Sequence, residues 1–134
     1  MIPFNDLKIG DYVKCTFEGK QWEGEVIDLN HDEKQVCVAT EVQEFWYEPD
    51  DLEPLPLNDE QLQKLHFKKE VQADGSIKYS KGAFRMLIPG EGDFSGLDMW
   101  YREDRRYHPN VHYIHQLQNH YADMTKIHLT TAPM

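Results

Sequence analysis

Ten residues in the C-terminal part of the chain, "HYIHQLQNHY" at 112–121, hold three histidines and three side-chain amides. Imidazole nitrogens bind metal ions and transfer protons near neutral pH, so this segment is the first candidate for chemistry. His112 and His115 are three residues apart, a spacing at which two side chains on one helix can share an ion. A third ligand would have to come from elsewhere, such as His108, because the chain has no H-E-x-x-H motif. A metal-dependent enzyme built on these histidines is one hypothesis.

The simpler interpretation is that this segment is the polar side of a helix. Asn110 is a suitable N-cap and residues 111–126 contain no proline or glycine, which predicts four turns of helix ending near Lys126. At 100° per residue, one stripe gathers the residues expected to face the core: Tyr113, Ile114, Leu117, Tyr121 and Met124. The opposite stripe gathers the polar residues, which we expect to be solvated or to form an interaction surface: His112, His115, Gln116, Asn119 and Asp123.

Charge is distributed unevenly along the 134 residues. The net charge of −10 arises entirely in residues 1–57, which hold four lysines and fourteen acidic residues, while the rest of the chain is balanced. Such a field repels phosphate backbones and attracts cations or basic peptides, so nucleic-acid binding by this part is disfavoured. An inhibitor that mimics DNA is an alternative, and it would require acidic side chains in rows at phosphate-like spacing.

Composition predicts a folded cytoplasmic protein. With 40% hydrophobic residues the chain can form a core, and no apolar run is long enough to span a membrane. The N-terminus lacks the basic and apolar regions of a signal peptide. Cys15 and Cys37 lie in strand-like runs and make no C-x-x-C pair, so we expect two reduced, buried thiols. No cofactor is predicted.

Before residue 57, short runs of strand-forming residues alternate with turn signals. Four or five strands in about fifty residues predict a small barrel. In "YVKCTF" a period of two places Val13, Cys15 and Phe17 on one face. Pro54 and Pro56 then exclude a helix or a central strand, which places the boundary between two units, residues 1–57 and 58–134, near Leu57.

These residues resemble a known family. "LKIGDYVKCTFEGKQWEGEVIDL" followed by "QVCVATEVQEFWYEPDDLEPL" is similar to the Tudor-like branch of SH3-type barrels over residues 7–57. Members of that family often bind methylated side chains in an aromatic cage, in which cation–π attraction holds the ligand. The resemblance implies four candidate contacts: Trp22, Phe45, Trp46 and Tyr47. Because side chains alternate along a strand, Phe45 and Tyr47 should share one face and Trp46 the other, so at least one aromatic should lie outside the core.

The second unit is predicted to be α+β. Asn58 can cap a helix over residues 59–66, with Gln61 at the capping-box position. An antiparallel meander of three or four strands should follow, with a hairpin at Asp74-Gly75, a loop at "GEGDFSG" and a short strand after the last helix. Arg102, Arg105 and Arg106 could form an anion-binding fork, but the acids among them favour a solvated loop.

A second resemblance covers most of the chain. "PLNDEQLQKLHFKK" and "VHYIHQLQNHYADMTKIHLT" are similar to segments of a group of small, functionally uncharacterised proteins common in Bacteroidetes genomes and their phages. His66 stands where the group has a helix-ending glycine, and His120 where an apolar residue is commoner. The resemblance implies a phage-associated bacterial protein in which "HQLQN" belongs to the architecture or to a shared interface.

The sequence therefore predicts an α+β protein: a small SH3-like β-barrel followed by an antiparallel β-meander with two helices. The expected function is a non-enzymatic interaction module that binds another protein or a basic peptide. The expected contacts are the four N-terminal aromatics and, second, the stripe of His112, His115, Gln116 and Asn119.

Overall fold

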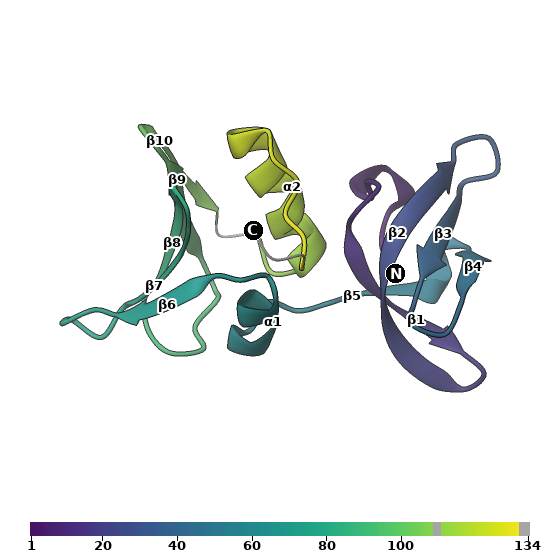
Figure 1. Cartoon of the computed structure of the whole chain (residues 1–134), viewed down its shortest axis with the longest axis horizontal. Coiled ribbons are helices and arrows are strands. Elements are labelled where there is room, and N and C mark those ends of the chain that lie inside the picture. The colour runs from purple at the N-terminus through teal and green to yellow at the C-terminus, as the bar shows by residue number, and fades with distance from the viewer. Residues whose placement is uncertain (109–110, 132–134) are drawn as a thin grey trace. The chain divides into compact units, whose positions relative to one another are not determined.

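The computed structural model describes residues 1–108 and 111–131 (Figure 1). Within these residues the chain is an α+β protein with two five-stranded antiparallel sheets and two α-helices, as the sequence predicts at this level. The chain divides into two compact units. The first comprises Met1–Pro56 with Tyr113–Asn119, and the second comprises Leu57–His112 with the chain from His120 onward.

The first unit contains one sheet and two short 3-10 helices, η1 (Phe4–Asp6) and η2 (Pro49–Asp51). Its strands are β1 (Tyr12–Phe17), β2 (Lys20–Asn30), β3 (Gln35–Ala39), β4 (Glu44–Tyr47) and β5 (Leu52–Pro54). Their order is β4-β3-β2-β1-β5, so the last strand returns to pair with the first. Among the described residues, β4 and β5 are the two free edges and do not pair, so the sheet is not a closed barrel.

Alternating side chains build the core of the first unit. Val13 and Cys15 are buried on one face of β1, as predicted, and Phe17 is half-buried. Gly24 in β2 is required by close packing, since a Cβ there would lie 2.5 Å from Cγ1 of Val38. The cluster is completed by Ile2, Leu7, Val26, Val36, Tyr47 and Leu52.

The second unit contains a five-stranded meander rather than the three or four strands predicted. Its strands are β6 (Lys68–Val71), β7 (Ile77–Lys81), β8 (Phe84–Ile88), β9 (Leu97–Tyr101) and β10 (Asp104–His108), in the order β10-β9-β8-β7-β6. The fifth strand is β10, where the sequence favours a solvated loop. Arg102 adopts the left-handed conformation (φ 58°) that a tight hairpin needs, and Arg105 then bonds Asp98 of β9 at 3.0 Å. Asp74-Gly75 does form a hairpin, with Gly75 at φ 89°.

Helix α1 (Asp59–Lys64) is shorter than predicted. The predicted cap is confirmed, because Oδ1 of Asn58 accepts a 2.8 Å hydrogen bond from the backbone N–H of Gln61. The helix ends before residue 66 because His66 is left-handed, with φ 67°. That is the conformation glycine commonly supplies after a helix, so His66 occupies a glycine-like position.

Helix α2 (Ile114–Thr125) begins three residues later than predicted, and Asn110, its expected cap, lies outside the described residues. Four members of the predicted core stripe are buried: Ile114, Leu117, Tyr121 and Met124. The fifth, Tyr113, is 37% exposed; it precedes the helix and forms an isolated bridge with Pro56. After α2, residues 126–131 form no strand, unlike the short strand expected. No helix of the described residues is long and apolar enough to cross a membrane.

Candidate functional site: an acidic, aromatic hollow

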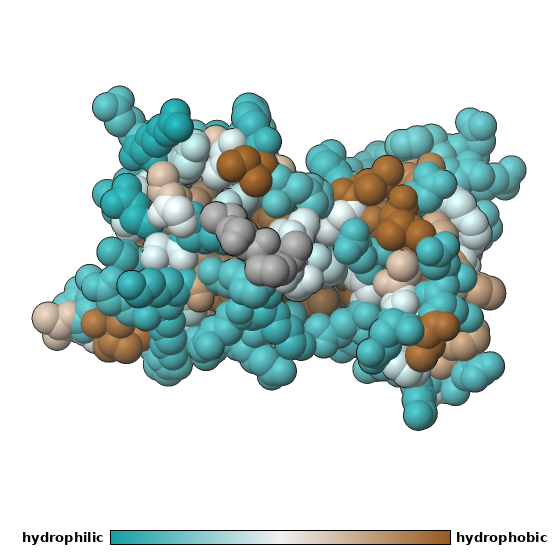
Figure 2. All heavy atoms as spheres, in the orientation of Figure 1, coloured by the Kyte–Doolittle hydropathy of each residue, from teal (hydrophilic) through white to brown (hydrophobic). Residues whose placement is uncertain are grey.

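The surface carries separate hydrophobic patches among hydrophilic side chains, as Figure 2 shows for one face. The described residues of the first unit include a hollow of about 530 Å³. All five strands and η2 contribute to its lining, which consists of Thr16, Gln21, Gln35, Phe45, Trp46, Tyr47, Glu48, Asp50, Asp51 and Glu53. We call this feature the hollow. It combines aromatic and acidic side chains, the two groups that bind organic cations.

Edge strand β4 supplies the aromatic side of the hollow. The rings of Phe45 and Tyr47 lie 5.4 Å apart on one face of the strand and Trp46 points to the other, as predicted. Phe45 is 50% exposed and Trp46 is 42% exposed, whereas Tyr47 is buried. Phe45 and Trp46 lie on opposite faces of β4 and both line the hollow. The hollow therefore extends along the free edge of this strand.

Tyr47 supports the hollow from the core. Burial and a hydrogen bond with the thiol of Cys15 raise the pKa of Tyr47 to about 12, so its hydroxyl stays protonated at neutral pH. Trp22, the fourth predicted aromatic, is half-buried against the core cluster and does not line the hollow. The hollow thus brings together three of the four predicted aromatics.

Four exposed carboxylates supply the acidic side of the hollow: Glu48, Asp50, Asp51 and Glu53. None of the ten lining residues is basic. Their polar contacts are few: Nε2 of Gln35 donates to Glu48 at 3.1 Å, and the Met1 ammonium lies 3.5 Å from Glu53. The four acids lie within residues 48–53, directly after the three aromatics, but a short acidic run is also typical of an ordinary solvated loop, so the sequence does not single them out.

The predicted polar stripe of α2 is wrong in one important respect. His115 is only 3% exposed and stacks on Tyr113, with ring centroids 6.1 Å apart, and its burial lowers its pKa. His112 is exposed, and Gln116 and Asn119 are half-buried. Oε1 of Gln116 accepts a 3.2 Å hydrogen bond from the backbone N–H of Tyr113. Of the face expected to be wet, His112 and Asp123 are exposed and only His115 is buried.

Gln118, which the helical pattern did not single out, carries the main contact between α2 and residues 6–12. Its Nε2 donates to the carbonyl of Gly10 at 2.9 Å, and its Oε1 accepts from the backbone N–H of Tyr12 at 2.8 Å. Nδ2 of Asn119 donates to the carbonyl of Asp6 at 3.0 Å. These bonds satisfy backbone groups more than 100 positions away in the sequence, so the role of the two amides is architectural.

Asp11 lies at the same contact and is fully buried. Its Oδ2 accepts from the backbone N–H of Lys8 at 3.0 Å and from Nδ2 of Asn119 at 3.4 Å, while Oδ1 is a buried atom without a hydrogen-bond partner. Burial raises the pKa of Asp11 to about 7. A carboxyl that solvent does not reach cannot meet a ligand, so we assign Asp11 to the fold.

The described residues contain no group of three or more histidine, cysteine or acidic side chains placed to hold a metal ion. The side chain of His108, suggested as a third ligand in the metal alternative, lies outside the described residues. The arginine fork, which the sequence disfavoured, does not form either. Arg105 bonds Asp98, and Arg106 bonds Asp104 at 2.9 Å and Asp123 at 2.8 Å, so both guanidinium groups face carboxylates of the chain.

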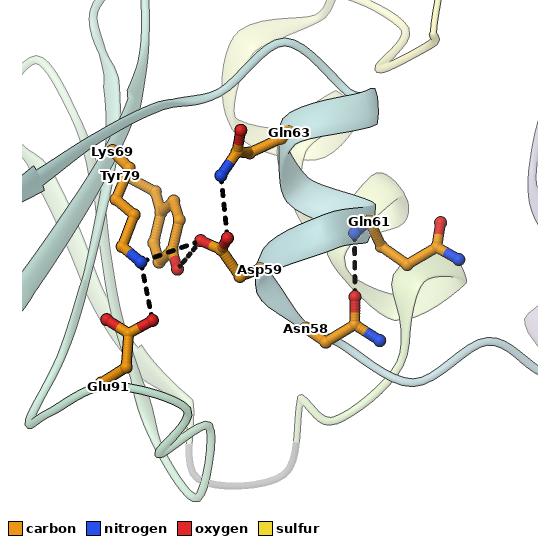
Figure 3. A network of polar contacts seen from close by, with 7 residues as sticks. All are labelled: Asn58, Asp59, Gln61, Gln63, Lys69, Tyr79 and Glu91. Atoms are coloured by element: carbon orange, nitrogen blue, oxygen red, sulfur yellow. Dashed lines mark hydrogen bonds and ion pairs between the residues drawn. The ribbon is translucent and has the colours of Figure 1, made fainter.

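A second acidic cluster surrounds the start of α1 (Figure 3). Asp59 accepts hydrogen bonds from the hydroxyl of Tyr79 at 2.7 Å and from Nε2 of Gln63 at 2.8 Å. Nζ of Lys69 lies 3.3 Å from Asp59 and 2.7 Å from Glu91. The bond from Tyr79 and the charge of Lys69 lower the pKa of Asp59. Both acids of this cluster thus have a partner within the chain.

Comparison of the chain with protein-family models, with curated proteins and with solved structures gave no match.

Proposed function

We propose that this protein is a non-enzymatic interaction module whose hollow binds a basic segment of another protein. The observation that carries the proposal is the lining itself: four exposed carboxylates and two exposed aromatic rings, with no basic residue among them. A lysine or arginine side chain entering the hollow would gain attraction from the acids and from the faces of Phe45 and Trp46. The field of the first unit, with its excess of ten negative charges, would draw such a segment in.

The chain offers an internal precedent for this chemistry. In the second unit, the guanidinium groups of Arg85 and Arg105 lie 5.0 and 5.7 Å from the ring centroid of Trp100. Among the described residues, no lysine or arginine is stacked on Trp46 in this way. The cation that Trp46 lacks is therefore the group we assign to the partner.

The finer fold assignment, a Tudor-like or SH3-like barrel, belongs to the same proposal. The return of β5 to β1 and the 3-10 turn η2 just before β5 support it, together with the sequence resemblance over residues 7–57. An open seam between β4 and β5 would then be the ligand-facing side. Two buried, free cysteines support the predicted cytoplasmic location, where thiols stay reduced.

The proposal is tested by titrating the protein with a short peptide of alternating arginine and serine, using calorimetry. We expect Trp46→Ala to weaken binding about tenfold, since a cation–π contact contributes roughly 1 kcal/mol or more when partly desolvated. Val71→Ala is the matched control, because Val71 is also an exposed hydrophobic residue on an edge strand, but of the second sheet. Binding should weaken with added salt.

Two results would contradict the proposal. One is the absence of binding by the wild-type protein at low salt. The other is equal affinity of the wild type and a folded Trp46→Ala variant, which would locate any binding away from the hollow. A peptide in which glutamate replaces arginine serves as the charge control and should not bind.

A further inference from the structure

Strand β4 presents backbone groups that no part of the described chain uses. Among the described strands it is an edge strand that pairs only with β3, in a regular register from Ala39 opposite Glu44 to Val36 opposite Tyr47. The register fixes which backbone groups point outward. The backbone N–H of Thr40 donates to the carbonyl of Gln43 at 2.8 Å, which makes these two residues a hydrogen-bonded pair.

In an antiparallel ladder, hydrogen-bonded and non-hydrogen-bonded pairs alternate. Counting from Thr40 and Gln43, the pairs of Glu44 with Ala39 and of Trp46 with Cys37 are non-hydrogen-bonded. The N–H and C=O groups of Glu44 and Trp46 therefore point away from β3, toward the open edge. No hydrogen bond to these four groups is found among the described residues.

The open edge and the hollow coincide. Phe45 and Trp46 line the hollow from opposite faces of β4, and both rings are about half exposed. An extended segment lying along this edge would pair with Glu44 and Trp46 through its backbone. Because its side chains would alternate between the two faces, successive basic residues on one face could reach the acids beyond β4.

We propose that the basic partner binds as an added strand, pairing its backbone with the outward N–H and C=O groups of Glu44 and Trp46. This inference rests on the proposed function and adds the conformation of the partner and the backbone groups that recognise it. The main competing occupant of a free edge is a second copy of the same chain. Charge argues against it, since two first units would bring together two excesses of ten negative charges.

The test uses a proline that removes one outward donor and no sheet hydrogen bond. Glu44→Pro deletes an N–H that points away from β3, a position at which an edge strand tolerates proline. Glu44→Ala is the matched control, because it removes the same carboxylate and keeps the N–H. We expect the arginine–serine peptide to bind Glu44→Pro at least fivefold more weakly than Glu44→Ala, with thermal unfolding showing both variants folded.

A second measurement needs no variant of the protein. Two versions of the peptide carry N-methyl groups on alternate residues, one on the odd positions and one on the even positions. If the peptide is an added strand, only one version loses binding, because only alternate N–H groups face β4. Equal binding of both versions, or equal affinity of Glu44→Pro and Glu44→Ala, overturns the added strand and leaves the hollow as a side-chain site. No binding to the wild type overturns the proposed function as well.

Sedimentation of the wild type without peptide completes the test. A monomer is expected. A dimer that Glu44→Pro dissociates and Glu44→Ala preserves would assign the edge to a second copy and overturn the inference.

Discussion

The two units contain similar aromatic and acidic side chains but differ in whether basic groups of the chain contact them. In the second unit, Trp100 has two arginines over its ring, and Asp59 and Glu91 share Lys69. In the first unit, the hollow holds Trp46 and four exposed carboxylates, and no basic side chain lines it. Cations of the chain thus pair with these side chains in the second unit, whereas in the hollow only Glu53 has such a partner among the described residues, the Met1 ammonium.

The difference follows from the distribution of charge along the chain. Residues 58–134 hold equal numbers of basic and acidic residues, so their acids can find partners nearby, whereas residues 1–57 hold four lysines for fourteen acids. An acidic side chain that pairs with a basic residue of the same chain stabilises the fold, but it is then not available to bind a cationic ligand. Among the described residues, Glu48, Asp50 and Asp51 form no ion pair, so they contribute little to the fold and are available to a cationic partner, whereas Glu53 lies 3.5 Å from the Met1 ammonium and opposite Lys14 in the sheet. The comparison therefore separates structural clusters from a candidate binding site.

The largest expected effect on stability comes from Asp11. It is an acid of the first unit that, unlike the acids of the hollow, belongs to the fold. Its pKa is raised from 3.8 to about 7, so the folded state holds a proton that the unfolded state has released. The free energy of unfolding should therefore fall as pH rises from about 4 to about 7, by at most about 4 kcal/mol. Urea denaturation across this range should show the fall in the wild type and a smaller one in Asp11→Asn.

The pH dependence of stability that His115 contributes runs in the opposite direction to that of Asp11. Burial lowers the pKa of His115, so its contribution to stability is lost as pH falls below 6.5 and cannot imitate the Asp11 effect. Identical pH dependence of the wild type and Asp11→Asn would show that Asp11 is ionised in the folded protein.

Tyr79→Phe should break the neutralised cluster of the second unit. The variant keeps the buried ring and loses the 2.7 Å hydrogen bond to Asp59. A hydrogen bond to a charged acceptor contributes about 1–3 kcal/mol, and we expect a loss of stability in that range in urea. Tyr107→Phe is the control, since Tyr107 is 65% exposed. A loss no larger than that of the control would show that the cluster does not stabilise the fold.

His66→Gly concerns the other end of the helix that carries Asp59. His66 adopts φ 67°, and its ring contacts the carbonyl of Thr131 at 2.6 Å in an exposed setting. Glycine removes the backbone strain, and we expect a gain of about 0.5–1 kcal/mol in thermal unfolding. His66→Ala, which retains the strain and loses the ring, separates the two contributions and should destabilise. A loss of stability in both variants would mean that the ring contact stabilises the protein by more than the backbone strain destabilises it.

The smallest effect on stability is expected from Asp50 and Asp51 of the hollow, whose replacement should nevertheless weaken binding strongly. Replacing Asp50 and Asp51 together by asparagine should change the free energy of unfolding by less than about 0.5 kcal/mol, because both side chains are exposed at the surface. The same change should weaken binding of the arginine–serine peptide about tenfold. A large loss of stability would contradict the difference drawn between the two units, since it would show that these acids also stabilise the fold.

Local patterns in the sequence predicted features of both sheets. The period of two placed Val13 and Cys15 in the core, and the alternation of Phe45, Trp46 and Tyr47 was correct because a strand leaves no other choice. Asp74-Gly75 marked its hairpin because glycine there takes a left-handed conformation. Such predictions succeed where the physical cause lies within a few residues.

The errors concern contacts that the local sequence pattern does not reveal. Helical periodicity predicts one buried stripe and one wet stripe for α2, but His115 of the wet stripe is buried, and Gln118, which lies on neither stripe, is buried against the backbone of Gly10 and Tyr12. Strand β10 is not predicted because its charges look solvated until Arg105 is paired with Asp98 across the hairpin. The hollow is only half predicted: its aromatics were singled out, but the acids at 48–53 that directly follow them resemble an ordinary solvated loop.

The central claim, that the open acids and rings of the first unit bind a basic segment, is tested most directly by nuclear magnetic resonance. Backbone and tryptophan side-chain signals of the isotope-labelled chain are followed while the arginine–serine peptide is added. We expect chemical-shift changes concentrated in β4, η2 and β5 and at the indole of Trp46, with the indole signal of Trp100 unchanged. Shifts centred on the second unit, or none at all, would contradict the claim.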